Sequence, residues 1–186
     1  MDDSFIAKPL GQRQIDQAYP LVQAIAPGLG VEQWRAFAAA FLAPRDAPAP
    51  PAGIMTVQNA RGYIHGLFSF TVERSLHHGR ILAVSNVMVL DLFDMSGPAE
   101  ALLRSMEGLA RGHGCAAIHT TLPEGLREGA GDGSESHRTL LGCFRNEGHR
   151  LETLRLCKPL DGASGHRAQP RPDGARDVVR DAEQPV

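Results

Sequence analysis

The chain has 186 residues, of which 42% are hydrophobic and 22% are charged, and its formal net charge is -2. This composition is typical of a globular domain that is long enough to bury a substantial core. The nearly balanced charge, without a basic cluster, argues against nucleic acid or an anionic membrane as a partner. No apolar run reaches the roughly 20 residues that a membrane-spanning helix needs.

The cysteines and histidines form no recognisable metal or disulfide pattern. Cys115, Cys143 and Cys157 contain no C-x-x-C pair, which predicts reduced thiols in a cytoplasmic protein. His77 and His78 are adjacent, so their side chains would point apart on a strand and make a poor chelate. We therefore predict no metal site. The acidic N-terminus lacks a long apolar stretch and predicts no secretory signal.

The first quarter of the chain predicts one strand and two helices. Residues 4–8 are typical of a short strand, and apolar side chains recur with helical spacing over residues 12–25. Pro20 lies inside that helix and predicts a kink or a split. A second helix is predicted over residues 31–43, before a stiff proline-rich connector at residues 43–53.

Three strands and a long helix are predicted next. The strands cover residues 53–59, 63–73 and 80–90, and the turn residues between them favour antiparallel hairpins. The helix carries a regular apolar stripe between Gly97 and Gly112. The strand over residues 80–90 and this helix together form the first half of a crossover connection.

The remaining elements complete a mixed sheet. A strand over residues 115–121 should pair in parallel with the previous strand, because a helix separates the two. A short helix over residues 136–146 and a final strand over residues 149–158 follow. Residues 161–186 contain few large apolar side chains and predict a disordered tail. The fold class is therefore α/β: a mixed, mostly antiparallel sheet with helices on both faces, in a domain over residues 1–160.

The junction Ser96-Gly97-Pro98 joins a strand to the long helix. A helix N-terminus exposes unpaired N–H groups and a partial positive charge, and phosphates bind there. Gly97 would let the backbone lie against a ligand, and Pro98 suits a first helical turn. The pattern indicates either a diphosphate cradle or a well-capped joint between strand and helix.

The element order and this junction resemble the GNAT acyltransferase superfamily, over about residues 5–160. The family motif V-x-x-x-x-(Q/R)-x-x-G-x-(G/A) is matched without a gap by Val89-Leu-Asp-Leu-Phe-Asp94-Met-Ser-Gly97-Pro-Ala99. The resemblance implies an N-acyltransferase with acetyl-CoA as co-substrate, whose diphosphate is held by the loop amides. It implies that the pantetheine arm pairs with the main chain near Val89, because the fourth and fifth strands splay apart. The coenzyme-binding residues that it implies are Met88, Val89, Asp94, Met95, Ser96, Gly97, Pro98, Ala99 and Phe144.

Three of the departures from the family pattern bear on the chemistry. Asp94 replaces the Gln or Arg of the first motif, and a carboxylate repels a diphosphate. The later family signature, N-x-x-A-x-x-x-Y-x-x-x-G-F, falls on residues 137–149. There His137 replaces Asn, and Phe144 replaces the Tyr that protonates the leaving thiolate. Phe144 has no proton to give.

Acyl transfer from a thioester needs a positioned amine that has lost its proton and a donor for the oxyanion. A backbone N–H near Val89 is the candidate donor. Glu73, Asp91 and His119 are candidate bases, and His137 could replace the missing Tyr as proton donor. Each of these four side chains also fits a role outside catalysis, as a solvated strand end, an edge residue, a sheet histidine or the start of an exposed helix.

Three functions stay open at this point. The first is an N-acetyltransferase whose partners are acyl-CoA and an amine of a small molecule or protein. The second is an acyl-CoA-binding or regulatory domain that has lost catalysis, as Asp94 and Phe144 favour. The third is an interaction domain whose sheet edge receives a peptide strand. GNAT-like proteins are often dimers, so a homodimer is among the expected assemblies.

Overall fold

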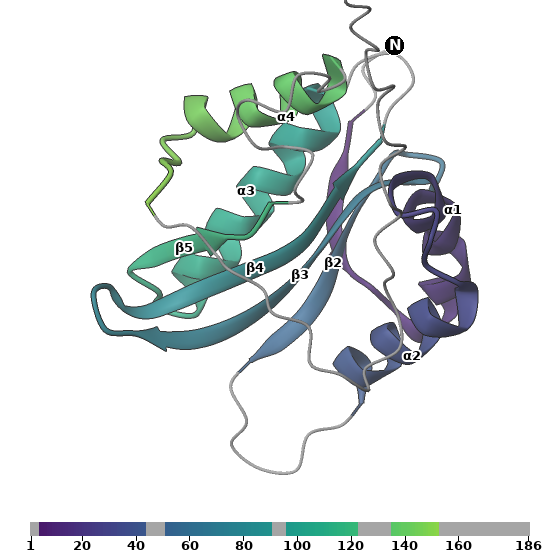
Figure 1. Cartoon of the computed structure of the whole chain (residues 1–186), viewed down its shortest axis with the longest axis horizontal. Helices are drawn as coiled ribbons and strands as arrows, with labels where there is room; N and C mark the ends of the chain where they lie inside the picture. Colours follow the sequence, from purple (N-terminus) through teal and green to yellow (C-terminus); the bar gives the residue numbers. More distant parts are fainter. Residues whose placement is uncertain (1–3, 44–50, 91–95, 123–134, 153–186) are drawn as a thin grey trace, which may run out of the picture. The chain divides into compact units, whose positions relative to one another are not determined.

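The computed structural model describes residues 4–43, 51–90, 96–122 and 135–152, with the backbone alone for residues 135–137. The chain divides into two units, Met1–Arg150 and Leu151–Val186. Leu151 and Glu152 are the described residues of the second unit, and both are exposed. All helices and strands described below belong to the first unit (Figure 1).

The strands of the first unit form one five-stranded sheet in the order β1-β2-β3-β4-β5. Neighbouring strands from β1 to β4 pair antiparallel, and β5 pairs with β4 in parallel. The predicted hairpins and the predicted parallel crossover are therefore confirmed. The elements in chain order are β1 (Ile6–Pro9), the 3-10 helix η1 (Gln12–Gln14), α1 (Ile15–Ile25), α2 (Val31–Leu42), β2 (Ala52–Gln58), β3 (Ile64–Ser75), β4 (Gly79–Val89), α3 (Ser96–Gly112), β5 (Ala117–Thr120) and α4 (Glu135–Asn146).

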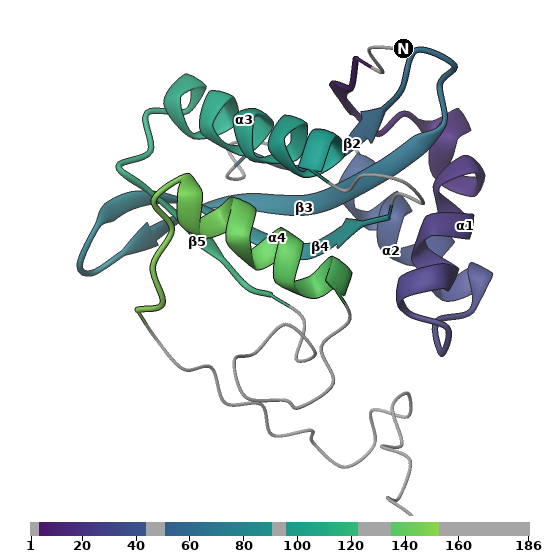
Figure 2. The same ribbon diagram turned by 90° about the horizontal axis from the view of Figure 1, so that it is seen from above.

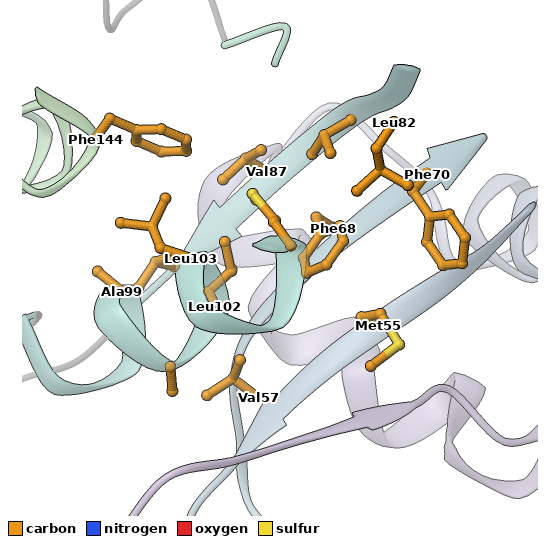
Figure 3. Packing of buried hydrophobic residues seen from close by; sticks show 14 of the residues in the cluster. Met55, Val57, Phe68, Phe70, Leu82, Val87, Ala99, Leu102, Leu103 and Phe144 are labelled. Carbon is orange, nitrogen blue, oxygen red and sulfur yellow. The ribbon is translucent and has the colours of Figure 1, made fainter. Parts of the chain in front are cut away.

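Helices cover both faces of the sheet, as predicted. Helices α3 and α4 lie on one face, and α1 and α2 lie on the other (Figures 1 and 2). Because side chains alternate along a strand, β2, β3 and β4 contribute to both cores. The core under α3 and α4 includes Met55, Val57, Phe68, Phe70, Leu82, Val87, Leu102, Leu103 and Met106 (Figure 3); the core under α1 and α2 includes Leu10, Ile15, Val22, Trp34, Ile54 and Leu67.

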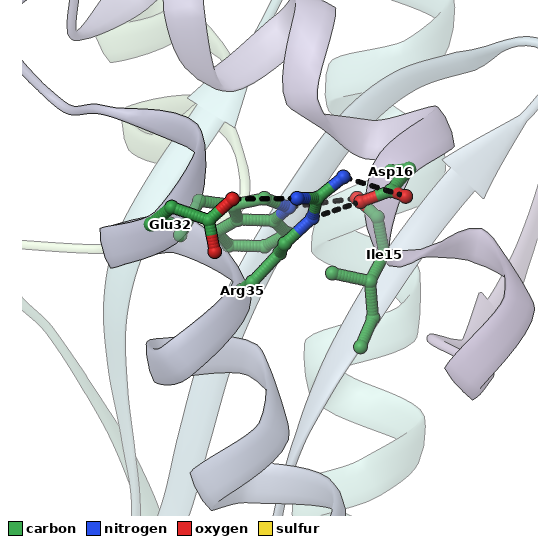
Figure 4. A network of polar contacts seen from close by, with 5 residues as sticks. Ile15, Asp16, Glu32 and Arg35 are labelled. Carbon is green, nitrogen blue, oxygen red and sulfur yellow. Dashed lines mark hydrogen bonds and ion pairs between the residues drawn. The ribbon is translucent and has the colours of Figure 1, made fainter.

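Helices α1 and α2 are joined by a buried hydrogen bond and an exposed ion-pair network. The indole N–H of Trp34 donates to the carbonyl oxygen of Ile15 at 2.7 Å. Arg35 pairs with Asp16 at 2.8 Å and with Glu32 at 2.6 Å (Figure 4). The hydrogen bond from Arg35 holds the pKa of the Asp16 carboxyl below its usual range. This network fixes how the two helices cross.

Pro20 does not split the first helix, so of the two predicted alternatives, a kink or a split, the split was wrong. Helix α1 runs unbroken from Ile15 to Ile25 with Pro20 inside it. Proline removes one backbone N–H, which would bond to the carbonyl of Asp16. Because α1 begins only one residue before Asp16, the loss falls in the first turns of the helix. The irregular segment is instead the 3-10 turn at Gln12–Gln14.

The predicted final strand differs from the structure where the two can be compared. Residues 149–152 belong to no strand, and residues 153–158 lie outside the described residues. The expected domain boundary at residue 160 and the tail over residues 161–186 also lie outside them. Among the helices of the described ranges, none combines the length and apolar character needed to cross a membrane.

Candidate active site

A bulge interrupts the pairing of β3 with β4 near the end of β4. Leu67 pairs with Met88, and Ser69 pairs with Ser85. One residue of β3 therefore faces two residues of β4, Asn86 and Val87. Asn86 has a φ of 52°, which lies in the left-handed region that L side chains rarely adopt.

Ser69 fills the gap that the bulge leaves in the ladder. Its hydroxyl donates to the carbonyl oxygen of Ser85 at 3.1 Å and accepts from the Asn86 side-chain amide at 2.9 Å. Ser69 is 3% exposed, and both bonds are part-buried. The Asn86 side chain thus stabilises the unusual backbone angle of its own residue.

The bulge also changes which face the side chains of β4 occupy. Leu82 and Val84 lie in the core under α3 and α4, and after the bulge Val87 and Val89 lie in the same core. Strict alternation would place the second pair on the opposite face. Met88 accordingly packs toward α1 and α2. The side chains of Met88 and Val89 are therefore structural, and only their main chain is available to a ligand.

That main chain borders a strand flank with no described partner. β5 pairs with β4 from Ile81 to Val84, and one further bond joins the Thr121 N–H to the Val84 carbonyl at 2.8 Å. Within the described ranges, no strand pairs with the β5-facing flank of Ser85–Val89. The N–H of Leu90 bonds to His65 of β3 at 2.8 Å, so the amide of Val89 points to the opposite flank. The N–H of Val89 therefore points to the side of β4 where β5 would lie if the pairing of the two strands continued.

The N-terminus of α3 follows β4 after a short connection. Helix α3 begins at Ser96, and Pro98 in its first turn contributes no N–H. The first turn of α3, with Gly97 in it, therefore carries the partial positive charge of this end. Of the predicted coenzyme-binding residues, Asp94 and Met95 lie outside the described residues, as does the candidate base Asp91.

Gly97 has a packing role that the sequence does not reveal. A Cβ atom at this position would lie 2.9 Å from Cε2 of Phe5. The Phe5 ring also packs edge-on against His65, with ring centroids 5.2 Å apart. The missing side chain therefore lets α3 approach Phe5, which precedes β1, in addition to any contact with a ligand.

Glu73 is far from the open flank. It pairs in register with Ile81 near the β3–β4 hairpin, eight residues before Val89, or about 26 Å along the strand. Its exposed carboxylate accepts a hydrogen bond from Thr71 at 2.6 Å. This is the solvated strand end that the sequence left open as an alternative to catalysis.

His119 is not brought to Val89 either. His119 pairs in register with Ala83, six residues or about 20 Å from Val89. Its Nε2 lies 3.0 Å from Nδ1 of His78. His137 lies in α4, but its side chain is outside the described residues. The structure therefore separates Glu73 and His119 from Val89 and leaves the main chain at the end of β4 and the start of α3 as the candidate site.

Phe144 belongs to the core and not to a ligand surface. It is 3% exposed, packs in the core that contains Val87 and Leu103 (Figure 3), and makes an edge-on contact with His149 at 4.9 Å between ring centroids. Its burial leaves little of the ring for a coenzyme. The position that the family gives to tyrosine is thus used here for packing.

Two residues of this region escaped the sequence analysis as functional candidates. Ser69 fixes the bulge, and Thr120 lies at the end of the paired part of β5, where its buried hydroxyl has no hydrogen-bond partner among the described residues. A sequence signal for the bulge does exist. The apolar alternation at Leu82 and Val84 resumes out of phase at Val87 and Val89, with Asn86 between them.

Comparison with solved structures identifies this architecture. An aminoglycoside N-acetyltransferase, AAC(6')-Iy, in complex with CoA superposes with a TM-score of 0.62 at 12% identity, over 87% of this chain and 97% of the other. An acetyltransferase from Trypanosoma brucei gives a TM-score of 0.59 at 15% identity, over 84% and 99% of the two chains. A ribosomal-protein-alanine N-acetyltransferase from Brucella melitensis gives 0.60 at 15% identity, over the same shares.

The chain has the GNAT acyltransferase fold. No protein-family model and no curated protein matches it by sequence. The matched region covers 97 to 99% of the chain of each of these neighbours, so no large domain of theirs lacks a counterpart here. The end of the described β4–β5 pairing at Val84 and Thr120 and the start of α3 are the features from which we argue a function.

Proposed function

We propose that this chain is an N-acyltransferase that moves an acetyl group from acetyl-CoA to an amine of a small molecule or a protein. The observation that carries the proposal is the β5-facing flank of β4 at Ser85–Val89, with which no strand of the described ranges pairs, followed in the chain by the N-terminus of α3. Structural neighbours with the same fold include an N-acetyltransferase in complex with CoA. The acetyl donor and the amine acceptor are both part of the proposal.

The main chain supplies the groups that would hold the donor. The N–H groups in the first turn of this 17-residue helix, that of Gly97 among them, suit a diphosphate, because they lie at the positive end of the helix dipole. Asp94 and Met95 complete this proposed loop. The N–H and C=O of Val89 suit the amides of a pantetheine arm, which would add to β4 as a strand does.

The same main chain supplies the electrostatic part of the reaction. The amine nitrogen attacks the thioester carbon, and the carbonyl oxygen takes up negative charge. An N–H at or near Val89 can donate to that oxygen, and such donors commonly contribute two to three orders of magnitude in rate. The C–S bond then breaks, and the thiolate leaves with the electron pair. Positioning the amine beside an already activated thioester supplies much of the remaining acceleration.

The proton of the amine has no assigned acceptor in the described part of the site. The residues of β3 opposite Val89 and Met88 are Gly66 and Leu67, so this strand supplies no base there. Asp91 and His137 stay candidates for proton transfer. Thr120, whose buried hydroxyl lies where the described pairing of β5 with β4 ends, is a further group that could donate a hydrogen bond to the ligand.

The proposal is tested by incubating the protein with acetyl-CoA and a panel of primary amines and measuring acetylated products by mass spectrometry. We expect acetylation that Asn86→Ala reduces, because the bulge positions the β4 amides. Leu76→Ala is the matched control, since Leu76 is 97% exposed at the far hairpin and its loss should leave the rate unchanged. Failure to bind acetyl-CoA would contradict the proposal.

A specific observation favours a second function, a domain that binds acyl-CoA without turning it over. Phe144 occupies the position of the family tyrosine, and its ring is buried in the core. The leaving thiolate would then lack its usual proton donor. Tight binding of acetyl-CoA with no product from any amine would support this second function over the first.

A further inference from the structure

Two histidines that are far apart in the sequence meet at the paired end of β4 and β5. His78 lies in the turn between β3 and β4, and His119 lies in β5. Nδ1 of His78 and Nε2 of His119 are 3.0 Å apart, and one ring donates to the other. The rings are nearly perpendicular, at 89°, with centroids 5.1 Å apart.

Both histidines are held by regular backbone structure. The N–H of His78 bonds to the Ser75 hydroxyl at 3.3 Å, and the turn ends at Gly79, whose φ is 69°. His119 lies within the parallel pairing of β5 with β4, next to the bond from the Ala116 N–H to the Arg80 carbonyl at 2.7 Å. The two half-buried rings are therefore brought together at little cost in side-chain freedom.

We propose that His78 and His119 form a binding site for a divalent transition-metal ion. Imidazole nitrogens bind such ions at about 2.1 Å, so two nitrogens 3.0 Å apart subtend roughly 90° at the ion. This is the angle between neighbouring ligands in octahedral or square-planar geometry. The ion replaces the proton shared by the two rings, the rings rotate to direct both nitrogens at it, and water fills the remaining positions.

The surrounding charges and the ligand type bear on the expected strength and selectivity. Arg74 and Arg80 pair in register in the same hairpin, and both are exposed. Glu73 in the same hairpin is exposed as well, so these charges of opposite sign are screened by water and salt and should change the affinity little. Nitrogen ligands and an angle near 90° favour Ni²⁺ or Cu²⁺ over Zn²⁺, which prefers tetrahedral sites. Mg²⁺ and Ca²⁺ prefer oxygen ligands and should not bind.

The test is a calorimetric titration with NiCl2 of protein that carries no polyhistidine tag. His119→Gln and His78→Asn place an amide near the position of the ligating nitrogen, so the hydrogen bond can persist while the metal ligand is lost. We expect each substitution to weaken Ni²⁺ binding about tenfold or more. His77→Gln is the matched control, because the exposed neighbour His77 should leave the affinity unchanged.

Thermal unfolding gives a second readout of the same proposal. Because the ion should bind the folded state, Ni²⁺ should raise the melting temperature of the wild type and of His77→Gln but not of the other two variants. Lowering the pH to 5.5 should weaken the effect, since protonated imidazole is no ligand. Unchanged Ni²⁺ affinity in both His119→Gln and His78→Asn would overturn the proposal, as would loss of binding in His77→Gln alone.

Discussion

Asn86 shows how one residue can set the geometry of a strand flank. A left-handed backbone costs an ordinary L residue about 1–2 kcal/mol, and asparagine tolerates it best because its short side chain bonds locally. Here that bond runs from the exposed Asn86 side chain to the buried Ser69 hydroxyl at 2.9 Å. Because of the bulge, the side chains of Val87 and Val89 lie in the same core as that of Val84. The N–H of Val89 points to the β5-facing flank of β4.

Substitutions at Asn86 separate the backbone requirement from the hydrogen bond. Asn86→Ala should lower the free energy of unfolding by about 1–2 kcal/mol, because alanine tolerates the left-handed backbone less well and cannot make the hydrogen bond to Ser69. Asn86→Gly keeps the backbone freedom and should cost clearly less. Urea denaturation measures both values. If the alanine variant is as stable as the glycine variant, the left-handed angle does not constrain this site.

Thr120 offers a comparison of stability with activity. Its buried hydroxyl lacks a described partner, so Thr120→Val should leave the free energy of unfolding unchanged or slightly raised. If the hydroxyl donates to the ligand, the same change should lower the rate of acetyl transfer about tenfold. Thr71→Val is the control: it loses a bond to Glu73 at the hairpin and should not affect the rate. A destabilised Thr120→Val protein with full activity would assign the hydroxyl a purely structural role.

At the scale of elements, the start of α3 is fixed by its contact with Phe5. Gly97→Ala places a Cβ atom 2.9 Å from the Phe5 ring and should destabilise the protein by about 1 kcal/mol or more. Gly108→Ala in the same helix meets nothing within 4 Å and should stabilise by about 0.5–1 kcal/mol through helix propensity. Urea denaturation of both variants checks this. A Phe5→Leu background should relieve the first effect; if it does not, the clash is not the cause.

The contact between α1 and α2 predicts a dependence on pH. Arg35 lowers the pKa of Asp16 in the folded protein, so the pair stabilises above the unfolded pKa of about 4. That stability is lost as the pH falls through the lower folded pKa. Asp16→Asn should therefore be slightly less stable than the wild type at pH 7 and equal to it in strong acid. Because the pair is exposed, high salt should remove the difference. Equal stability at pH 7 in low salt would contradict this.

The elements themselves were largely predictable, because each rests on local patterns. The turns at residues 59–62 and 77–79 marked the hairpins, and Gly62 and Gly79 have the positive φ angles that such turns require. The split predicted at Pro20 does not occur, because a proline early in a helix removes only one backbone hydrogen bond. The bulge at Asn86 was missed, because its signal is a slip between two otherwise regular apolar patterns.

At the scale of the whole molecule, the fold was predictable and the grouping of side chains was not. Element order and pairing define a GNAT architecture that persists at 12 to 15% identity to the neighbours described above. The distance of Glu73 from Val89 follows from the register of β3 with β4, which the turn at residues 77–79 sets, and the interpretation of Glu73 as a base overlooked that constraint. Phe144 likewise matches a motif position, yet its burial is set by how α4 packs on the sheet.

The central claim is that the main chain of β4 and the start of α3 bind acyl-CoA. Backbone amide NMR during titration with acetyl-CoA tests it most directly, since it reads those N–H groups one by one. We predict that the amide signals of Val87, Met88, Val89, Ser96, Gly97 and Ala99 shift in proportion to occupancy, while those of Glu73 and His78 at the far hairpin stay in place. Saturating acetyl-CoA that leaves the β4 and α3 amides unmoved, or that shifts only the hairpin, would contradict the account.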